Sequence, residues 1–535
     1  MKPLGRAFVQ QARHHPCRFA MADARYPHLS FGSVLGKVVY VARRLRPHWA
    51  GQEMVGIFLP PSVGGALVNL AALLAGKVPV NLNYTLTAEA LASCAAQCGL
   101  KTIVTSKAFR DKVQTALPCP ELLLEQTLAA PGLTEKLVAA ALAWLTPVRR
   151  LEKAVGCERT PELDHLATVV FSSGSTGDPK GVMLSHYNLA SNIAQLGQTF
   201  DFGPRDRFLG ILPFFHSFGL TAILLEPAVH GIGVVFHPNP LEGKAVGELV
   251  RRFGVTYLMA TPSFLQIYLR SCEPEDFGSL TFVMAGAEKL PEWLTVAFEE
   301  KFGIRPVEGY GCTECSPVVA ANTHNFRAAG ARQVGARRGK IGRPMPGMSV
   351  RIVDPETGAP VPIGQPGLLL VRGPNVMQGY LHRPEKTAEV LRDGWYVTGD
   401  IATLDEDGFL QITDRLSRFI KIGGEMVPLV KIEEELHKLA GVSELTFVAT
   451  GVPDEKKGER MVVLHKLGEP QIAELLSHLA QLDLPNLWIP KARQFLAVPE
   501  FPKLGTGKLD LRRVRELAAS LLQEAERQRS ETLAG

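Results

Sequence analysis

The chain has 535 residues, of which 46% are hydrophobic and 21% charged, and its formal net charge is +5. This length exceeds what one compact core holds and predicts two or more domains, while the composition excludes a disordered or fibrous chain. The charge is mild and no basic run stands out, so a nucleic-acid partner is not expected. Eight cysteines at irregular spacing do not form a disulfide scaffold, which favours a reducing compartment.

Two apolar stretches, residues 54–76 and 209–236, approach the roughly 20 residues that a helix needs to cross a bilayer. The first is interrupted by Pro60 and Pro61, and the second contains histidine, glutamate, prolines and glycines. Both are therefore expected to form buried strands, turns and helices instead of membrane spans. The N-terminal segment also lacks the apolar core of a signal peptide. An integral membrane transporter is not favoured.

Over the first two thirds of the chain, short β-rich runs such as "ATVVFSS", "VTYLMA" and "LTFVMAG" alternate with longer helical stretches. This alternation predicts a mostly parallel sheet covered by helices, with ligands at the carboxyl ends of the strands. From about residue 342, Asp-Gly and Thr-Gly turns separate short runs and predict the hairpins of a smaller β subdomain. The last part of the chain, roughly 120 residues, predicts an α+β domain that ends in a fraying helix.

Residues 171–181, "FSSGSTGDPKG", combine three glycines, four hydroxyl residues and one lysine directly after an expected strand. Glycines let backbone N–H groups turn toward an anion, and lysine adds a mobile charge, so the segment predicts a phosphate-binding loop at the carboxyl end of that strand. It differs from the common P-loop, because Pro179 precedes Lys180 and Gly181 follows it. The alternative is a plain turn.

Further polar clusters follow the glycine loop in order along the chain. They are "LPFFHSFG" (212–219), "AGAEKL" (285–290), "EGYGCTECSP" (308–317), "GWYVTGD" (394–400), "DRLSRFIKIGGE" (414–425) and "FPKLGTGKLD" (501–510). This ordered set resembles the adenylate-forming superfamily, which includes acyl-CoA synthetases, luciferases and peptide-synthetase adenylation domains. The resemblance covers nearly the whole chain. It implies an α/β fold with a large N-terminal domain, residues 1–413, that combines helix-covered sheets with a β subdomain, and a small mobile α+β domain, residues 414–535.

The resemblance also implies a reaction in two halves, with ATP and Mg²⁺ as cofactors. A carboxylate attacks the α-phosphate of ATP to give an acyl-adenylate and pyrophosphate, and a thiol then displaces AMP. The hydroxyl and N–H groups of the glycine loop suit the β- and γ-phosphates, with Lys180 as a countercharge. The positions assigned to the nucleotide are Ser172, Ser173, Gly174, Ser175, Thr176, Gly177, Lys180, Gly286, Ala287, Glu288, Glu308, Gly309, Tyr310, Gly311, Asp400 and Arg415.

Catalytic roles are implied for Lys508, Thr313, Glu314 and His216. Lys508 would bridge the carboxylate and the α-phosphate, and would be carried away when the small domain rotates for thiol transfer. Thr313 would contact the α-phosphate, and Glu314 together with Thr176 would hold Mg²⁺, which prefers oxygen ligands. His216 would lie at the entrance to the carboxylate site. The lack of an aspartate in its motif favours a carboxylic acid without an α-amine.

Several of these positions have a simpler structural interpretation. Glu314 can be a solvated carboxylate, Asp400 can be a turn former, and His216 can be a core residue packed among the phenylalanines of its motif. Cys312 and Cys315 form a CxxC pair, but a structural zinc site needs a second pair of ligands, and none is evident in the sequence.

Two positions depart from the family pattern. Ser417 stands at the hinge, where Asp or Lys is usual, and Met426 replaces an arginine after the "GG" step. A hinge needs only a backbone that is free to change its dihedral angles, so the rotation can still pivot at Ser417. The departure nevertheless weakens that assignment.

The segments "GPNVMQGYL", "RFIKIGGEMVPL" and "LGTGKLDL" are most similar to one branch, the adenylation module of bacterial acyl-[acyl-carrier-protein] synthetase/2-acylglycerophosphoethanolamine acyltransferase. This resemblance implies a long-chain fatty acid as substrate and the phosphopantetheine thiol of acyl carrier protein as acceptor. The alternative is a fatty acyl-CoA ligase, because coenzyme A presents the same thiol. An outside alternative is a non-catalytic nucleotide-binding relative.

The single His-x4-Asp spacing, His478 with Asp483, falls in an expected helix of the small domain and is interpreted as coincidence. Transfer of the acyl group onto a lysophospholipid would then need a separate acyltransferase. The expected location is the cytoplasm, with peripheral contact with the inner face of the membrane left open.

Overall fold

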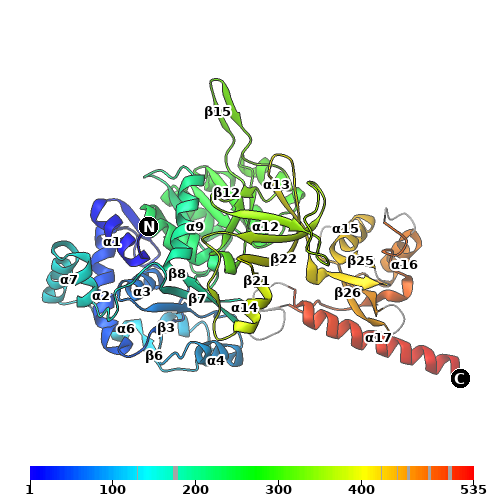
Figure 1. Cartoon of the computed structure of the whole chain (residues 1–535), viewed down its shortest axis with the longest axis horizontal. Coiled ribbons are helices and arrows are strands. Elements are labelled where there is room, and N and C mark those ends of the chain that lie inside the picture. The colour runs from blue at the N-terminus through cyan, green and yellow to red at the C-terminus, as the bar shows by residue number, and fades with distance from the viewer. Residues whose placement is uncertain are drawn as a thin grey trace.

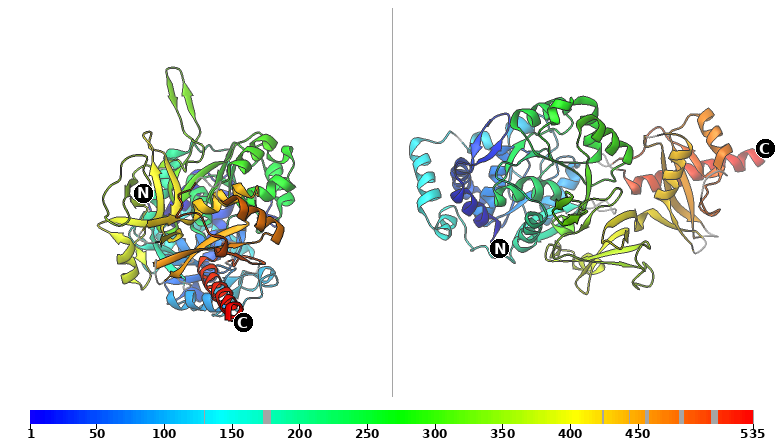
Figure 2. Two further views of the ribbon diagram at one scale, coloured as in Figure 1. Left: turned by 90° about the vertical axis from the view of Figure 1, so that its right-hand side faces the viewer. Right: turned by 90° about the horizontal axis from the view of Figure 1, so that it is seen from above.

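The computed structural model describes the chain except for residues 129, 173–178, 423–424, 443, 455–457, 480–483, 504–508 and 535, and except for the side chains of residues 417, 421, 425, 426, 526 and 528–534. Figure 1 shows a large body and, beside it, a smaller one that carries α15 (Leu429–Leu439), α16 (Glu469–His478) and α17 (Leu511–Ala534). The right-hand view of Figure 2 shows the same two bodies side by side, with α17 extending to the C-terminal end.

A nine-stranded sheet in the order β17-β14-β13-β12-β11-β9-β10-β1-β2 crosses the large body. The strands from β13 to β1 are parallel, and those at both edges pair antiparallel. The predicted helix-covered parallel sheet is therefore confirmed. The strands are β1 (Phe19–Ala22), β2 (Leu29–Ser30), β9 (Arg207–Gly210), β10 (Gly233–Phe236), β11 (Tyr257–Ala260), β12 (Phe282–Ala285), β13 (Val307–Gly311), β14 (Val318–Ala321) and β17 (Arg343–Pro344).

Helices bury both faces of this sheet, which explains why its strands read as continuous apolar runs. Leu258 and Val283 belong to the core on one face, whereas their strand neighbours Met259 and Met284 belong to the core on the other. The first core includes α11 (Gly243–Phe253), α12 (Pro262–Ser271) and α13 (Glu292–Phe302). The second includes α1 (Leu4–His14), α2 (Phe31–Trp49), α3 (Val63–Leu74), α9 (His186–Thr199) and α10 (Glu226–His230).

The two apolar stretches form buried α/β structure, as predicted. Residues 54–76 contain β3 (Met54–Ile57) and α3, and residues 209–236 contain a π-helix (Gly219–Leu225), α10 and β10. Within the described part of the chain, no helix combines the length and the apolar character that crossing a membrane requires.

Two smaller sheets lie beside the main one. A parallel sheet has the order β4-β3-β5-β6, and an antiparallel sheet has the order β20-β8-β7. Their strands are β4 (Val78–Asn81), β5 (Ile103–Thr105), β6 (Glu121–Leu123), β7 (Leu166–Ser172), β8 (Lys180–Ser185) and β20 (Gly379–Tyr380). The helices of this region are α4 (Ala88–Gln97), α5 (Lys107–Arg110), α6 (Leu124–Thr127), α7 (Leu133–Leu145) and α8 (Val148–Ala154).

The glycine loop lies in a different setting from the one predicted. It follows a strand, β7, as expected, but β7 pairs antiparallel with β8, so that Ser172 lies opposite Lys180. The loop therefore connects a β-hairpin and does not end a strand of the parallel sheet. The reason is that the residues after the loop, "KGVMLS", themselves form a strand and return along β7.

The predicted hairpins of the β subdomain are present. Its sheet has the order β18-β19-β22-β21, with β23 on β22. At Asp393 and Gly394 both φ angles are positive, 51° and 77°, as a two-residue hairpin turn requires. The elements are β18 (Ser349–Val353), β19 (Gly367–Arg372), α14 (Pro384–Val390), β21 (Leu391–Arg392), β22 (Trp395–Leu404) and β23 (Leu410–Arg415), and a separate hairpin, β15 (Phe326–Ala328) with β16 (Ala331–Gln333), projects from the body in Figure 1.

The smaller body is an α+β unit with strand order β25-β24-β27-β26 and β28 parallel to β27. Arg418 and Glu433 form a nearly buried ion pair inside it, and Glu433 also accepts the backbone N–H of Ala449 at 2.6 Å. The strands are β24 (Phe419–Ile422), β25 (Glu425–Pro428), β26 (Phe447–Asp454), β27 (Gly458–His465) and β28 (Phe495–Ala497). The predicted boundary between residues 413 and 414 falls inside β23 and stays a prediction, as does the pivot at Ser417.

Candidate active site

The candidate site lies where parallel strands end. The neighbouring strands β12 and β13 end at Ala285 and Gly311, and their carboxyl ends meet at the same edge of the sheet. The segment 286–288 follows β12, and a short turn (Thr313–Cys315) follows β13. Two of the sequence clusters are therefore neighbours because their strands are paired.

Glycines at these strand ends allow close backbone approach. A Cβ atom on Gly311 would lie 2.3 Å from the carbonyl oxygen of Pro317, and one on Gly286 would lie 3.1 Å from the ring of Phe218. Contacts this short exclude a side chain at Gly311 without a backbone shift. Ala287 adopts a left-handed φ of 69°, a conformation that alanine seldom takes.

Asp400 and Arg415 form an ion pair at the centre of the site. They lie opposite each other on β22 and β23, and Arg415 Nε is 2.9 Å from Asp400 Oδ1. The hydroxyl of Tyr310 donates a hydrogen bond to the other oxygen, Oδ2. The Asp400 side chain is 6% exposed, whereas that of Arg415 is 68% exposed. The charge of Asp400 raises the pKa of Arg415, and burial raises that of Tyr310 well above its ordinary value.

Glu314 lies in the short turn that follows β13. The hydroxyl of Tyr380 donates to Glu314 Oε1 at 2.8 Å, and the Glu314 backbone carbonyl accepts the N–H of Met377 at 2.7 Å. Lys180 Nζ lies 5.3 Å from the centre of the Tyr380 ring. Burial, and then the charge of Glu314, raise the pKa of Tyr380. Because Glu314 is nearly buried, the alternative of a freely solvated carboxylate does not hold.

Thr313 is hydrogen-bonded to Ser217, the residue that follows His216 in the chain. Ser217 Oγ donates to Thr313 Oγ1 at 3.3 Å, which brings the "LPFFHSFG" segment to the end of β13. His216 itself is exposed, with its ring 4.5 Å from that of Phe215. The alternative of a core histidine is therefore wrong, while its role at the carboxylate stays a prediction.

The two other glutamates of the predicted site hold local structure. Glu288 Oε2 accepts the hydroxyl of Ser263 at 2.7 Å, at the start of α12. Glu308 Oε1 accepts the N–H of Leu290 at 3.3 Å, and burial raises the pKa of Glu308. At Gly309, a Cβ atom would lie 3.0 Å from Met284 Sδ. These contacts order the two strand ends and leave a direct nucleotide role untested.

Several residues of the predicted site lie outside the described part of the chain. Ser172 and Lys180 are described, but residues 173–178 of the glycine loop and the implied catalytic lysine lie outside the described residues. The predicted site residues among them are Ser173, Gly174, Ser175, Thr176, Gly177 and Lys508. Asp483 also lies outside them, so the pairing of His478 with it is not tested.

The sequence interpretation missed Tyr380 and Ser217. Tyr380 lies in "GPNVMQGYL", a segment used only for the family resemblance, and its contact with Glu314 depends on the pairing of β20 with β8. Ser217 directly follows His216 and could have been found as the hydroxyl residue of that motif.

The two cysteines of the CxxC pair are not joined by a disulfide. Cys312 and Cys315 are free thiols, and the hydrogen bond between them and burial raise the pKa of Cys312. Among the described residues, no group of three or more His, Cys, Asp or Glu side chains is arranged to hold a metal ion.

Mg²⁺ in phosphate-transfer sites commonly takes one or two carboxylates together with substrate phosphates. Glu314, a nearly buried oxygen donor, therefore fits a Mg²⁺ ion that arrives with ATP.

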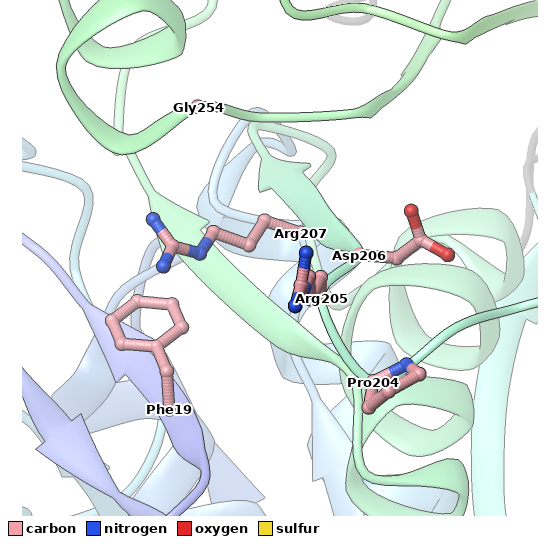
Figure 3. Close-up of a pocket in the computed structure, with 6 residues that line it drawn as sticks. All are labelled: Phe19, Pro204, Arg205, Asp206, Arg207 and Gly254. Carbon is pink, nitrogen blue, oxygen red and sulfur yellow. The ribbon is translucent and has the colours of Figure 1, made fainter.

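A surface pocket of about 440 Å³ lies at the opposite edge of the sheet (Figure 3). Arg207 stacks over the ring of Phe19 at 4.8 Å and donates to the carbonyl of Phe253, while the Asp206 carboxylate points away from Phe19. Because β1 and β9 begin here, the pocket is at the amino ends of the strands and is not part of the candidate site.

The structure is similar to solved structures of adenylate-forming enzymes. With ATP-bound MatB from Rhodopseudomonas palustris the TM-score is 0.79 at 26% identity, over 97% of this chain and 99% of that one. With O-succinylbenzoate coenzyme A synthetase (MenE) from Bacillus subtilis, in complex with ATP and magnesium, it is 0.77 at 22% identity, over the same shares. The predicted two-part α/β fold of this class is confirmed.

Sequence comparisons define the family. The family model described as AMP-binding enzyme matches residues 8–381. A long-chain-fatty-acid–CoA ligase of Bacillus subtilis is 35% identical over 364 residues, 66% of this chain and 62% of the relative, which is less than two thirds of that protein. One of Escherichia coli O6:H1 is 29% identical over 494 residues, 87% of this chain and 85% of the relative. The chain belongs to the AMP-binding enzyme family, and the predicted adenylate-forming acid–thiol ligase is confirmed as its class. The narrower resemblance to acyl-acyl-carrier-protein synthetase is not confirmed.

Proposed function

We propose that this enzyme uses ATP to join a long-chain fatty acid to the thiol of coenzyme A. The observation that carries the proposal is the meeting of two carboxylates, Asp400 and Glu314, at the end of β13, one paired with Arg415 and one with Tyr380. Such a site can hold a ribose on one side and a metal-bound phosphate on the other. The long-chain-fatty-acid–CoA ligases among the relatives support the choice of acid and acceptor.

The first half-reaction joins the acid to AMP. A carboxylate oxygen of the fatty acid attacks the α-phosphorus of ATP, the bond from this phosphorus to the oxygen shared with the β-phosphate breaks, and pyrophosphate leaves. Asp400 would accept hydrogen bonds from the ribose hydroxyls, with the exposed face of Arg415 beside it. Thr313 would contact the α-phosphate, and Lys180 would face the departing phosphates. Mg²⁺, when held by Glu314, neutralises charge on the leaving pyrophosphate.

In the second half-reaction, the thiolate of coenzyme A attacks the acyl carbon, and the bond from this carbon to the AMP oxygen breaks. We propose that residues 414–535 rotate between the halves and carry Lys508 away from the site. An ion pair between Lys289, just after the "AGAE" segment, and Glu434 on α15 joins the two bodies in the present arrangement. This exposed pair is the kind of contact that a rotation can break at small cost.

Acyl carrier protein, the acceptor first inferred from the resemblance, finds no support among the relatives described above, whose names specify coenzyme A. The acceptor test is direct. The purified enzyme is incubated with Mg-ATP and fatty acids of increasing chain length, with either coenzyme A or holo-acyl carrier protein, and acyl thioester formation is measured. We expect acyl-CoA, with the highest kcat/KM for long chains. Acyl transfer to the carrier protein alone would overturn the choice of acceptor.

The adenylation half is tested separately by fatty-acid-dependent exchange of labelled pyrophosphate into ATP. Lys508→Ala is expected to lower this exchange by about 100- to 1000-fold, the usual cost of removing one donor aimed at a transition-state charge. A chain that binds ATP but shows no exchange with any fatty acid would be a non-catalytic nucleotide-binding relative, which the proposal excludes.

A further inference from the structure

Helix α7 presents an apolar face to solvent. Leu133, Leu137 and Leu145 are 74%, 61% and 82% exposed, and Val138 and Trp144 are also exposed. These five side chains, called here the α7 apolar face, spread over the outward half of the helix together with Ala140 and Ala141. A surface helix normally turns charged or polar residues outward. Large contiguous apolar patches on a protein surface mark interaction sites.

The opposite side of α7 attaches the helix to the protein. Ala139 and Ala143, one turn apart, are buried, and α7 packs along α2. Arg13 donates to the carbonyls of Ala143 and Thr146 at 2.8 and 2.7 Å and so caps the end of the helix. Ala139, Ala143 and the partly buried Leu142, together with the half-buried cap from Arg13, attach α7 to the body, so the outward leucines are not needed for its attachment. The exposed apolar side chains of α7 therefore indicate a surface that another molecule covers.

Positive charge predominates on α7 and in the segment that follows it. Residues 133–153 carry four basic residues and two acidic ones. Lys136, Arg149 and Arg150 are exposed. Both acids are already paired, Glu152 with Arg6 at 2.6 Å and Glu135 with Arg44 at 3.6 Å. The exposed charges that remain on α7 and just after it, called here the basic flanks, are thus positive.

A second cluster of cations borders the same helix. The Arg25 guanidinium lies 5.6 Å from the centre of the Tyr26 ring. Burial, and then the charges of Lys136 and Arg25, lower the pKa of Lys37 on α2. Lys37 also lies 5.0 Å from the centre of the Tyr26 ring. Binding of a helix to a membrane interface grows with the apolar area that it buries and with the attraction of its cations to anionic lipids, and α7 and its surroundings offer both.

We propose that α7 docks this enzyme on an anionic lipid surface, with the α7 apolar face in the acyl boundary and the basic flanks on the headgroups. Figures 1 and 2 show α7 at the outer edge of the large body, at the end opposite α17, where a flat surface can reach it. A second copy of the chain is a poorer partner. Two-fold pairing presents the same surface of each copy to the other, so the exposed cations Lys136, Arg149 and Arg150 of one copy would face a surface of the same charge, and like charges repel.

This inference goes beyond the proposed function, because lipid binding needs no ATP, fatty acid or coenzyme A and can succeed or fail independently of the activity. The test is cosedimentation of the full chain with vesicles of phosphatidylcholine alone or mixed with phosphatidylglycerol. Leu137→Glu is compared with Leu241→Glu, because Leu241 is 60% exposed and lies outside α7, which makes it a matched control. Thermal unfolding of both variants checks that the fold is kept.

We expect the wild type to bind the mixed vesicles. Leu137→Glu should lower partitioning by about 10-fold or more, since burying one leucine side chain changes an equilibrium by at least that factor, whereas Leu241→Glu should have no effect. The double variant Arg149→Glu/Arg150→Glu should lose binding to mixed vesicles but keep the weak binding to phosphatidylcholine. Failure of the wild type to bind, or an equal loss in both leucine variants, would overturn the proposal. So would a dimer in the absence of vesicles that Leu137→Glu converts to a monomer, which would assign the face to a second copy.

Discussion

The two carboxylates of the candidate site are both nearly buried, yet their surroundings differ. Asp400 accepts the hydroxyl of Tyr310 on one oxygen and pairs with Arg415 at 2.9 Å on the other. Glu314, within the described part of the chain, accepts the hydroxyl of Tyr380 at 2.8 Å and has no ion pair. The cation on its side, Lys180, lies over the Tyr380 ring. One carboxylate is thus balanced by charge and the other is not.

This difference assigns different ligands to the two sides. A buried carboxylate that already has a cation attracts a further cation weakly, but its remaining lone pairs can accept neutral hydroxyl groups. A nearly buried carboxylate without a cation is costly on its own and is relieved when a cation arrives. The Asp400 side therefore suits a ribose, and the Glu314 side suits a metal ion.

The largest effect on activity is expected when Glu314, the carboxylate without a paired cation, loses its charge. Glu314→Gln keeps the oxygen that Tyr380 contacts but removes the negative charge that would hold Mg²⁺. We expect the rate of pyrophosphate exchange to fall by about 100-fold or more, since a metal ion supplies several kcal/mol of charge stabilisation. The measurement is exchange as a function of Mg²⁺ concentration, where the variant should need more Mg²⁺.

Tyr380→Phe is the control for this variant. It removes the hydroxyl but keeps the carboxylate and the ring under Lys180. We expect a loss of about 10-fold, the low end of the 1.5–3 kcal/mol that one hydrogen bond to a charged group contributes. An unchanged Mg²⁺ dependence in Glu314→Gln would contradict the assignment of this side to a metal ion.

A change at Asp400, the carboxylate that is paired with Arg415, should affect the binding of ATP more than the catalytic rate. Asp400→Asn removes the charge opposite Arg415 while keeping the size of the side chain. We expect the KM for ATP to rise by about 10- to 100-fold, since one hydrogen bond to a charged group is worth about 1.5–3 kcal/mol, with a smaller change in kcat. Steady-state kinetics with varied ATP measure this. Should kcat fall while the KM for ATP stays unchanged, Asp400 would contribute to the reaction step and not to ATP binding. The assignment of Asp400 to the ribose would then be wrong.

Much of this site could be predicted from the sequence, because motif residues at strand ends meet when their strands pair. Tyr310, Asp400 and Arg415 lie in three separate motifs, and the register of β22 with β23 brings the last two face to face. The sequence also predicted the Asp393-Gly394 turn correctly, since both residues tolerate positive φ.

The parts that could not be predicted depend on long-range pairing. Tyr380 reaches Glu314 only because β20 pairs with β8, and local patterns carry no register information for strands so far apart in the chain. In the same way, the apolar sequence of β7 is compatible with a parallel sheet and with a hairpin. The prediction that the glycine loop ends a strand of the parallel sheet was therefore wrong. His216 stands among phenylalanines in sequence, but its exposure depends on how that turn is placed.

The smallest effect concerns a second carboxylate on the balanced side. Asp414 lies next to Arg415, and burial raises its pKa from the ordinary 3.8 to about 6. A carboxyl group that holds its proton more tightly in the folded chain destabilises the fold once it ionises. The free energy of unfolding should therefore fall as the pH rises from about 4 to about 6, and stay lower above that range.

Asp414→Asn should remove this loss, because an amide oxygen can still accept the N–H of Arg415, which Asp414 Oδ1 accepts at 2.7 Å. At pH 8 we expect the variant to be more stable by about 1–3 kcal/mol, and at pH 3.5 to match the wild type, since each unit of pKa shift corresponds to 1.36 kcal/mol. Urea unfolding at both pH values measures the difference. A variant that is less stable at pH 8 would mean that the ionised Asp414 is held by Arg418, whose charge opposes the effect of burial. Asp400 with Arg415 and Asp414 with Arg418 would then be two charge-paired carboxylates in this part of the site. The difference from Glu314, which has no ion pair among the described residues, would be greater still.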